Sequence, residues 1–322
     1  MAERLRDPQP LVAIVTPVYN GGAHLRETMR SVQAQTYPNL VHVVLDNASS
    51  DDTAVIISDF ADQRVPVIAG KNKTVLKQYD NWNAAHDLVP GYAAYIRLLC
   101  ADDLMEPECT SRMVEVAETD PDILLVGTNV SKNHVPFPLN WDPAVPVLDG
   151  KEVIRRFFLN EMGFFAVHML MRKSVMDWRK PLYDDAYVGA DFEAVLGILK
   201  RGKFGMVHEQ LGFVRIHEAS MTSKVMLKKN THFADFLSAL HRHGPDVFGP
   251  DTFKHLAERY EMHYLRKSLR WKLQHGSDAT QLHFERLKAE RGEITLRDYA
   301  TCLKDWVLIK AGYRKYWDGF PS

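Results

Sequence analysis

Short apolar runs alternate with helical patterns over the first hundred residues of the chain. The runs have the length of buried strands, and the first two are rich in β-branched residues and are followed directly by Pro17 and Asp46. Between them, apolar residues recur at helical spacing, as Leu25, Met29 and Val32 do. We predict strands at residues 11–16, 41–45, 65–68 and 95–99, and helices at residues 24–35, 51–60 and 78–88. Strands that alternate with helices predict an α/β fold, with a mostly parallel sheet and helices on both faces.

The same alternation continues in the second half, and the end of the chain is helical. Residues 130–146 are rich in Pro and Asn, which predicts a loop between two halves of one domain. Further strands are predicted at 167–172 and 212–216, and a helix at 191–200. From about residue 224 onward the pattern is long and helical. We expect a main domain over residues 1–222, with halves of about 10–128 and 129–222, and a C-terminal helical extension over 223–322.

Composition narrows the classes of function. The formal net charge of −1 carries no signature of nucleic-acid binding, although residues 222–322 hold 18 Lys and Arg against 12 Asp and Glu. The three cysteines form no CxxC pair, which favours a reducing cytoplasm. No run is apolar enough for a secretory signal or a membrane span. We therefore expect a cytoplasmic protein, in which the basic helix around 264–272 makes a peripheral contact with the inner face of the membrane, a homodimer contact, or neither.

Polar residues gather where three of the predicted strands end. The residues Thr16 to Asn20 follow the first strand, Asp46-Asn47 the second, and Asp102-Asp103 the strand at 95–99. In parallel α/β sheets, ligands bind outside the carboxyl ends of the strands. The glycines of the first turn match neither GxGxxG nor GxxxxGK[ST]. One ligand site at this edge is predicted, without a nicotinamide-type or Walker-type phosphate loop.

These segments together resemble the family 2 glycosyltransferases, which use nucleotide sugars and have the GT-A fold. The stretches that carry the resemblance are "TPVYNGGAHLRETMRSVQAQTYPNLVHVVLDNASSDDT", "CADDLMEP" and "GADFEAVLGILKRGKFGMVHEQLGFVRIHEASMT". The resemblance covers roughly residues 11–222. It implies a nucleotide-binding half at about 10–128 and an acceptor half at about 129–222.

The resemblance implies a set of nucleotide contacts. Pro17, Tyr19 and Asn20 match the P-x-Y-N turn, which lies against the base and ribose, and Asp46 matches the aspartate that accepts a hydrogen bond from the base. Asn47-Ala48 stands where the family often has Asp-Gly. The nucleotide contacts expected in this way are Thr16, Pro17, Tyr19, Asn20, Asp46, Asn83, Ala101 and Asp102, with Asn81, Asp103 and Arg215 as further candidates.

The resemblance also implies a metal and a catalytic base. Asp102 matches the second acid of the DxD motif, which holds Mn²⁺ or Mg²⁺ against the donor diphosphate, whereas Cys100 replaces the first acid. His217 matches the histidine of an R-x-H segment that binds metal or diphosphate. Asp191 matches the catalytic aspartate, preceded here by Ala190. Asn81-Trp82-Asn83 stands where other members carry A-R-N.

The expected function is inverting transfer of a sugar from a UDP- or dTDP-linked donor to a polysaccharide, glycolipid, glycoprotein or lipid-linked acceptor. Asp191 would act as the base on the acceptor hydroxyl, and a cation on Asp102 and His217 would stabilise the leaving diphosphate. Structural alternatives remain: Asp46 and Asp102 can serve turns, Asp191 can cap a helix, and His168 is expected to be structural. A non-catalytic nucleotide- or glycan-binding module is the alternative function, favoured by the loss of two acids.

Overall fold

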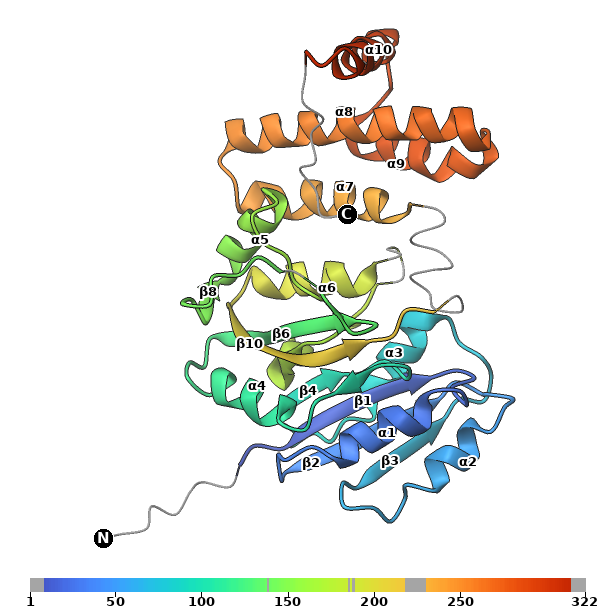
Figure 1. Cartoon of the computed structure of the whole chain (residues 1–322), viewed down its shortest axis with the longest axis vertical. Helices are drawn as coiled ribbons and strands as arrows, with labels where there is room; N and C mark the ends of the chain where they lie inside the picture. The colour runs from blue at the N-terminus through green and yellow to red at the C-terminus, as the bar shows by residue number, and fades with distance from the viewer. Residues whose placement is uncertain (1–8, 138, 185, 187–188, 218–229, 314–322) are drawn as a thin grey trace. The chain divides into compact units, whose positions relative to one another are not determined.

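The computed structural model describes residues 9–137, 139–184, 186, 189–217 and 230–313, and Figure 1 shows its elements. The chain forms two compact units. The first contains Met1–Gly150, Gly163–Ala186 and Ala190–Ile216, and the second contains Lys151–Met162, Tyr187–Gly189 and His217–Ser322. The mixed α/β fold with a C-terminal helical region confirms the predicted fold class. The predicted division at residue 222 stays a prediction.

Four parallel strands form one half of the sheet. The strands are β1 (Val12–Val18), β2 (Leu40–Asp46), β3 (Val67–Lys71) and β4 (Tyr95–Leu98), in the order β3-β2-β1-β4. Helices α1 (Leu25–Gln33), α2 (Thr53–Ser58) and α3 (Gln78–Asp87) connect them. Every residue of β1 and β2 is buried. This burial explains why both strands read as continuous apolar runs, since both faces of a parallel sheet are covered.

The sheet continues from β4 through strands of mixed direction. The order is β4, then β9 (Leu170–Arg172), β6 (Ile123–Lys132), β10 (Lys203–Val214) and β5 (Leu104–Met105), with β6 and β10 parallel and β9 antiparallel to both neighbours. Two short strands, β7 (Val135–Pro136) and β8 (Val147–Asp149), pair antiparallel with β6 and β10. The helices are α4 (Cys109–Ala117), α6 (Ala190–Leu199) and the 3₁₀ helix η1 (Lys173–Asp177).

The structure confirms the predicted strands and helices up to residue 99 and corrects several predictions beyond it. The predicted strand 212–216 is the end of a longer strand, β10, which begins at Lys203 and ends at Val214. The predicted loop 130–146 is wrong at its start, because β6 runs to Lys132 and β7 pairs back onto it. Of the predicted strand 167–172, only Leu170–Arg172 form a strand, β9. No element was predicted for β6, because an unbroken apolar run such as ILLVG fits a buried strand and a buried helix equally well. The amphipathic helix α4 was not predicted either.

The second unit is built from helices. Most of α5 (Gly150–Phe158) belongs to it, together with α7 (His232–His243), α8 (Pro250–His275), α9 (Gln281–Arg291), α10 (Leu296–Lys310) and the short 3₁₀ helices η3 (Gly244–Asp246) and η4 (Asp278–Thr280). α8 packs against α7, α9 and α10. Tyr264, Leu265 and Ser268 of α8 are fully buried. None of the helices in the described ranges is both long and apolar enough to cross a membrane.

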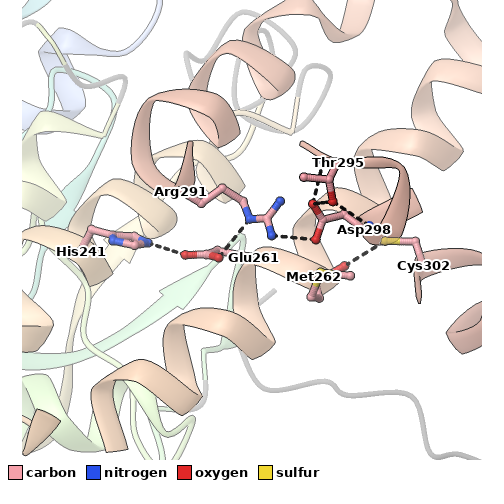
Figure 2. Close-up of polar contacts among 7 residues, drawn as sticks. All are labelled: His241, Glu261, Met262, Arg291, Thr295, Asp298 and Cys302. Atoms are coloured by element: carbon pink, nitrogen blue, oxygen red, sulfur yellow. Dashed lines mark hydrogen bonds and ion pairs between the residues drawn. The ribbon is translucent and has the colours of Figure 1, made fainter. Parts of the chain in front are cut away.

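Polar side chains join these helices to one another (Figure 2). Arg291 of α9 donates to Glu261 of α8 at 3.1 Å and to Asp298 of α10 at 2.9 Å, and His241 of α7 lies 2.9 Å from Glu261. Asp298 also closes a capping box with Thr295 at the start of α10. These carboxylates and the guanidinium are only 10–17% exposed, so the network links four helices through shielded charges.

Candidate active site

The loops after β1 and β2 are tied to each other. Asn20 N donates to Ser49 Oγ at 2.9 Å, and Asn20 Oδ1 accepts from Ser50 N at 3.0 Å. Gly21 N donates to Thr53 Oγ1 at 2.9 Å. A Cβ at Gly21 would lie 2.4 Å from a methyl group of the neighbouring core, so only glycine allows this approach. The P-x-Y-N turn and the loop after Asp46 therefore form one rigid rim.

Asp46 is a buried carboxylate with one oxygen left for a ligand. Its exposed fraction is 2%. Oδ1 accepts from Ser49 N at 2.8 Å, whereas Oδ2 lies 3.4 Å from Lys71 Nζ and accepts no hydrogen bond from any described residue. A buried acceptor without a donor costs free energy until a donor arrives. The N–H of a pyrimidine or purine ring is such a donor, which suits the role that the sequence predicts.

Asn47 acts on a loop of the protein itself. Its side-chain amide donates to Leu76 O and accepts from Leu76 N, both at 2.9 Å, and also accepts from Asn72 Nδ2 at 2.9 Å. Asn72 Nδ2 in turn donates to Asn81 Oδ1 at 2.9 Å. An amide can donate and accept at once, which a carboxylate cannot do. Asn47 therefore fixes the β3–α3 loop, and Asn81 belongs to the same network.

Several other residues predicted to contact the nucleotide have structural partners. The Thr16 hydroxyl lies 2.9 Å from His42 Nε2 inside the sheet, where burial lowers the pKa of His42 to about 3. Pro17 is buried, while Tyr19 is 54% exposed at the rim. The Asn83 amide pairs with both backbone groups of Tyr183, at 2.8 and 3.0 Å. Their predicted nucleotide contacts stay predictions, and for Asn83 the amide already has partners within the protein.

The turn after β4 brings three candidate metal ligands together. Donor atoms of Cys100, Asp102 and Asp103 lie within 4.8 Å of one another. Burial, followed by the nearby carboxylates, raises the pKa of the Cys100 thiol well above its ordinary value, so the sulfur stays protonated and suits a hard cation poorly. Asp103 is 3% exposed, and its oxygens accept from His168 Nε2 and Arg215 N, each at 3.0 Å.

Of these three candidate ligands, Asp102 is therefore the one best suited to bind a metal ion. One or two carboxylates plus substrate phosphates are a common set of ligands for Mg²⁺, so the turn fits a divalent cation that binds together with a diphosphate. Arg215 holds the turn in place: its guanidinium donates to Asp102 O at 3.1 Å and to Glu27 of α1 at 2.6 Å. Ala101 O accepts from Thr28 of α1 at 2.9 Å.

Two buried residues, His168 and Arg97, form a chain of contacts to Asp103, and neither was predicted to act in the site. Arg97 Nη2 lies 3.4 Å from His168 Nδ1. Because arginine can only donate, Nδ1 accepts, and Nε2 carries the hydrogen that it donates to Asp103. His168 was predicted to be structural, and it is 1% exposed. The sequence did hold one signal for these contacts, an arginine inside the strand Tyr95–Leu98, because a buried charge needs partners.

Asp191 lies at the start of α6. The Tyr79 hydroxyl donates to Asp191 Oδ1 at 3.4 Å and accepts from Ala190 N at 3.2 Å. Burial raises the pKa of Asp191 despite these hydrogen bonds, and a cavity of about 30 Å³ with mostly apolar walls lies beside it. After burial and the nearer carboxylates, the carboxylate of Asp191 also raises the pKa of Cys100, so Asp191 lies near the turn. Tyr79 was not predicted.

His217 lies within the described residues but belongs to the second unit, whereas the other predicted site residues belong to the first. Its role as a metal ligand stays a prediction.

Comparison with known proteins identifies the family of the chain. A family model described as "Glycosyl transferase family 2" matches residues 13–178, more than half of the chain. Glycosyltransferase GlyG of Streptococcus pneumoniae serotype 4 is 25% identical over 218 residues, which cover 66% of this chain and 64% of GlyG. The chain spans less than two thirds of the length of such curated relatives, from 14% to 64%.

Solved structures share the fold at low sequence identity. S. aureus TarS 1-349 in complex with UDP-GlcNAc matches with a TM-score of 0.67 and 13% identity, over 95% of this chain and 92% of that chain. The mannosyltransferase PcManGT of Pyrobaculum calidifontis, in complex with GDP-Man and Mn²⁺, matches with a TM-score of 0.58 and 14% identity, over 95% and 85%. The described architecture is thus GT-A-like.

Proposed function

The chain belongs to glycosyl transferase family 2, and on that premise we propose that it is an inverting glycosyltransferase that uses a nucleoside-diphosphate sugar. The observation that carries the proposal is the position of Asp191, which lies beside a cavity, accepts a hydrogen bond from Tyr79 and belongs to the same unit as the acidic Cys100–Asp103 turn. A raised pKa makes a carboxylate a stronger base, and Asp191 would accept the proton of the acceptor hydroxyl as that oxygen attacks the sugar. The Tyr79 hydroxyl, which donates to Asp191 Oδ1, would orient the carboxylate.

The donor would lie along the rim formed by the first two loops. Asp46 Oδ2 would accept the ring N–H of the base, and Asn20 and Tyr19 would border the ribose. A uracil or thymine base is our preferred reading, supported by the UDP-GlcNAc in the TarS complex. Asp102 would hold Mn²⁺ or Mg²⁺ beside the diphosphate, and the bound ion would neutralise charge that develops on the leaving group. The Mn²⁺ in the PcManGT complex supports this assignment.

The acceptor and the compartment complete the proposal. We propose a polysaccharide, glycolipid or glycoprotein acceptor and a cytoplasmic site of action. We also propose that the segment 130–147 and residues such as Glu161, Phe164 and Phe165 determine the choice of donor sugar and acceptor.

The decisive experiment separates binding from chemistry at Asp191. Calorimetry with UDP and Mn²⁺ measures donor-site binding, and release of nucleotide from a panel of UDP- and dTDP-sugars measures turnover. Asp191→Asn should keep binding within a few-fold and remove turnover, whereas the exposed control Asp87→Asn should change neither. Turnover that survives in Asp191→Asn would show that the base lies elsewhere. A wild-type protein that binds UDP but releases no nucleotide from any sugar would favour the non-catalytic binding module instead.

A further inference from the structure

Helix α10 exposes a row of large apolar side chains. Leu296 is 87% exposed, Leu303 63% and Trp306 50%, and Tyr299 and Val307 are exposed beside them. These positions recur every three or four residues, so they form one stripe along the helix. Aromatic and leucine side chains of this size are costly to leave in water as a continuous stripe. The stripe is therefore expected to be covered by something in the cell.

The acidic residues of α10 point away from this stripe. Asp298 pairs with Arg291 at 2.9 Å, and Asp305 lies 3.6 Å from Arg266 of α8. Both carboxylates are less than one fifth exposed, and Cys302 between them is buried. They are the only acidic residues in Leu296–Lys310. Both acidic residues of α10 therefore lie on the shielded side of the helix and not on the exposed stripe.

The exposed part of α10 keeps only positive charge. Arg297, Lys304 and Lys310 are all exposed. At 100° per residue, Arg297 and Lys304 fall on the polar flank of the stripe, and Lys310 falls at its C-terminal end. An apolar stripe with Trp and Tyr and a basic flank is typical of helices that lie in the interface of an anionic bilayer. A second copy of α10 would instead bring cations against cations.

We propose that α10 is a membrane-surface helix, whose stripe of Leu296, Tyr299, Leu303, Trp306 and Val307 inserts into the headgroup region of an anionic lipid bilayer. Arg297, Lys304 and Lys310 bind lipid phosphates at its flank. This assignment differs from the one based on sequence, which considered residues 264–272 of α8. There Tyr264, Leu265 and Ser268 are fully buried, so they are not available to lipid.

Co-sedimentation of the full chain with lipid vesicles tests the proposal without any enzyme assay. Vesicles of phosphatidylcholine, with or without phosphatidylglycerol, would be compared at low and high salt. The wild type should bind the anionic vesicles and be released by salt. Leu303→Ser combined with Trp306→Ser should weaken binding by about tenfold or more. Lys304→Glu combined with Lys310→Glu should weaken it by about tenfold on anionic vesicles only.

Matched variants make each outcome decisive. Val55→Ser removes an equally exposed apolar side chain from α2 and should leave vesicle binding unchanged. Circular dichroism should show the wild-type helix content in every variant, because the altered side chains are exposed. Failure of the wild type to bind anionic vesicles would overturn the proposal, as would equal binding by Leu303→Ser/Trp306→Ser. A wild-type dimer that this variant converts to a monomer in light scattering, without lipid binding, would show that a second copy covers the stripe.

Discussion

Replacement of Arg291 by Met should destabilise the helical unit more than any surface change would. In the wild type, Arg291 separates and neutralises Glu261 and Asp298, which it contacts at 3.1 and 2.9 Å (Figure 2). Met fills a similar volume but leaves two shielded carboxylates without their shared cation. Removing one partner from a buried ion pair typically costs about 3–5 kcal/mol. Because the groups keep 10–17% exposure, we expect the lower end, about 3 kcal/mol.

Urea unfolding followed by circular dichroism at neutral pH measures this loss, and a fall in melting temperature of roughly 10 °C should accompany it. The matched control is Arg297→Met on the exposed side of α10, which should change stability by less than about 0.5 kcal/mol. A triple variant, Glu261→Gln with Arg291→Met and Asp298→Asn, should recover most of the loss, because no unpaired charge remains.

The pH dependence gives a second readout. The hydrogen bond from Arg291, together with those from Thr295, lowers the pKa of Asp298. A lowered pKa in the folded state means that the carboxylate stabilises the fold above its ordinary pKa, about 4, and loses that contribution as the pH falls further. The wild type should therefore weaken in acid more steeply than Arg291→Met does. A loss under about 1 kcal/mol at neutral pH would refute the idea that the guanidinium holds these helices together.

Three further predictions concern the first unit. Ala48 has a φ of 56°, so Ala48→Gly should stabilise the protein by about 0.5–1 kcal/mol in urea unfolding, and destabilisation would contradict the strain assigned to it. Burial raises the pKa of Asp191, so turnover should be lost in acid at a higher pH than an ordinary aspartate would give. Tyr79→Phe removes a hydrogen bond that lowers this pKa and should move the loss to still higher pH, and an unchanged pH profile would show that the hydroxyl does not act on Asp191. Cys100→Asp should raise the affinity for Mn²⁺ in the presence of UDP by about tenfold in calorimetry, and an unchanged affinity would show that position 100 does not face the ion.

The elements that place the site follow from local patterns in the sequence. The runs ending at Thr16, Leu45 and Leu99 are mostly apolar, with His42 and Arg97 as exceptions, and polar residues follow shortly after each, which identifies parallel strands and the edge where they end. For α4 the sequence did carry a signal, because buried Cys109, Met113 and Ala117 recur every four residues while Arg112 and Glu115 are exposed. Strand β6 is mostly buried, and its place in the sheet depends on pairing with β9 and β10, which lie far along the chain.

The roles within the site depend on partners that no local pattern reveals. Asp102 and Asp103 look alike in the sequence, yet Asp103 is held by His168 and by the backbone of Arg215. Likewise, Asn83 looks available for a ligand but pairs with Tyr183, a hundred residues away. Such assignments need the tertiary structure, because hydrogen-bond partners satisfy buried polar groups regardless of sequence distance.

The partners of Asp103 also determine when this site can form during synthesis. Asp103 leaves the ribosome 112 residues ahead of Arg215, whose backbone holds it. At usual rates of translation this interval lasts roughly 5–20 s. During that time the strands of the proposed base-binding rim are already available, while β4 still lacks its neighbour β9 and the acidic turn lacks its support. A nascent chain should therefore form this rim well before it forms the turn that we propose for the diphosphate.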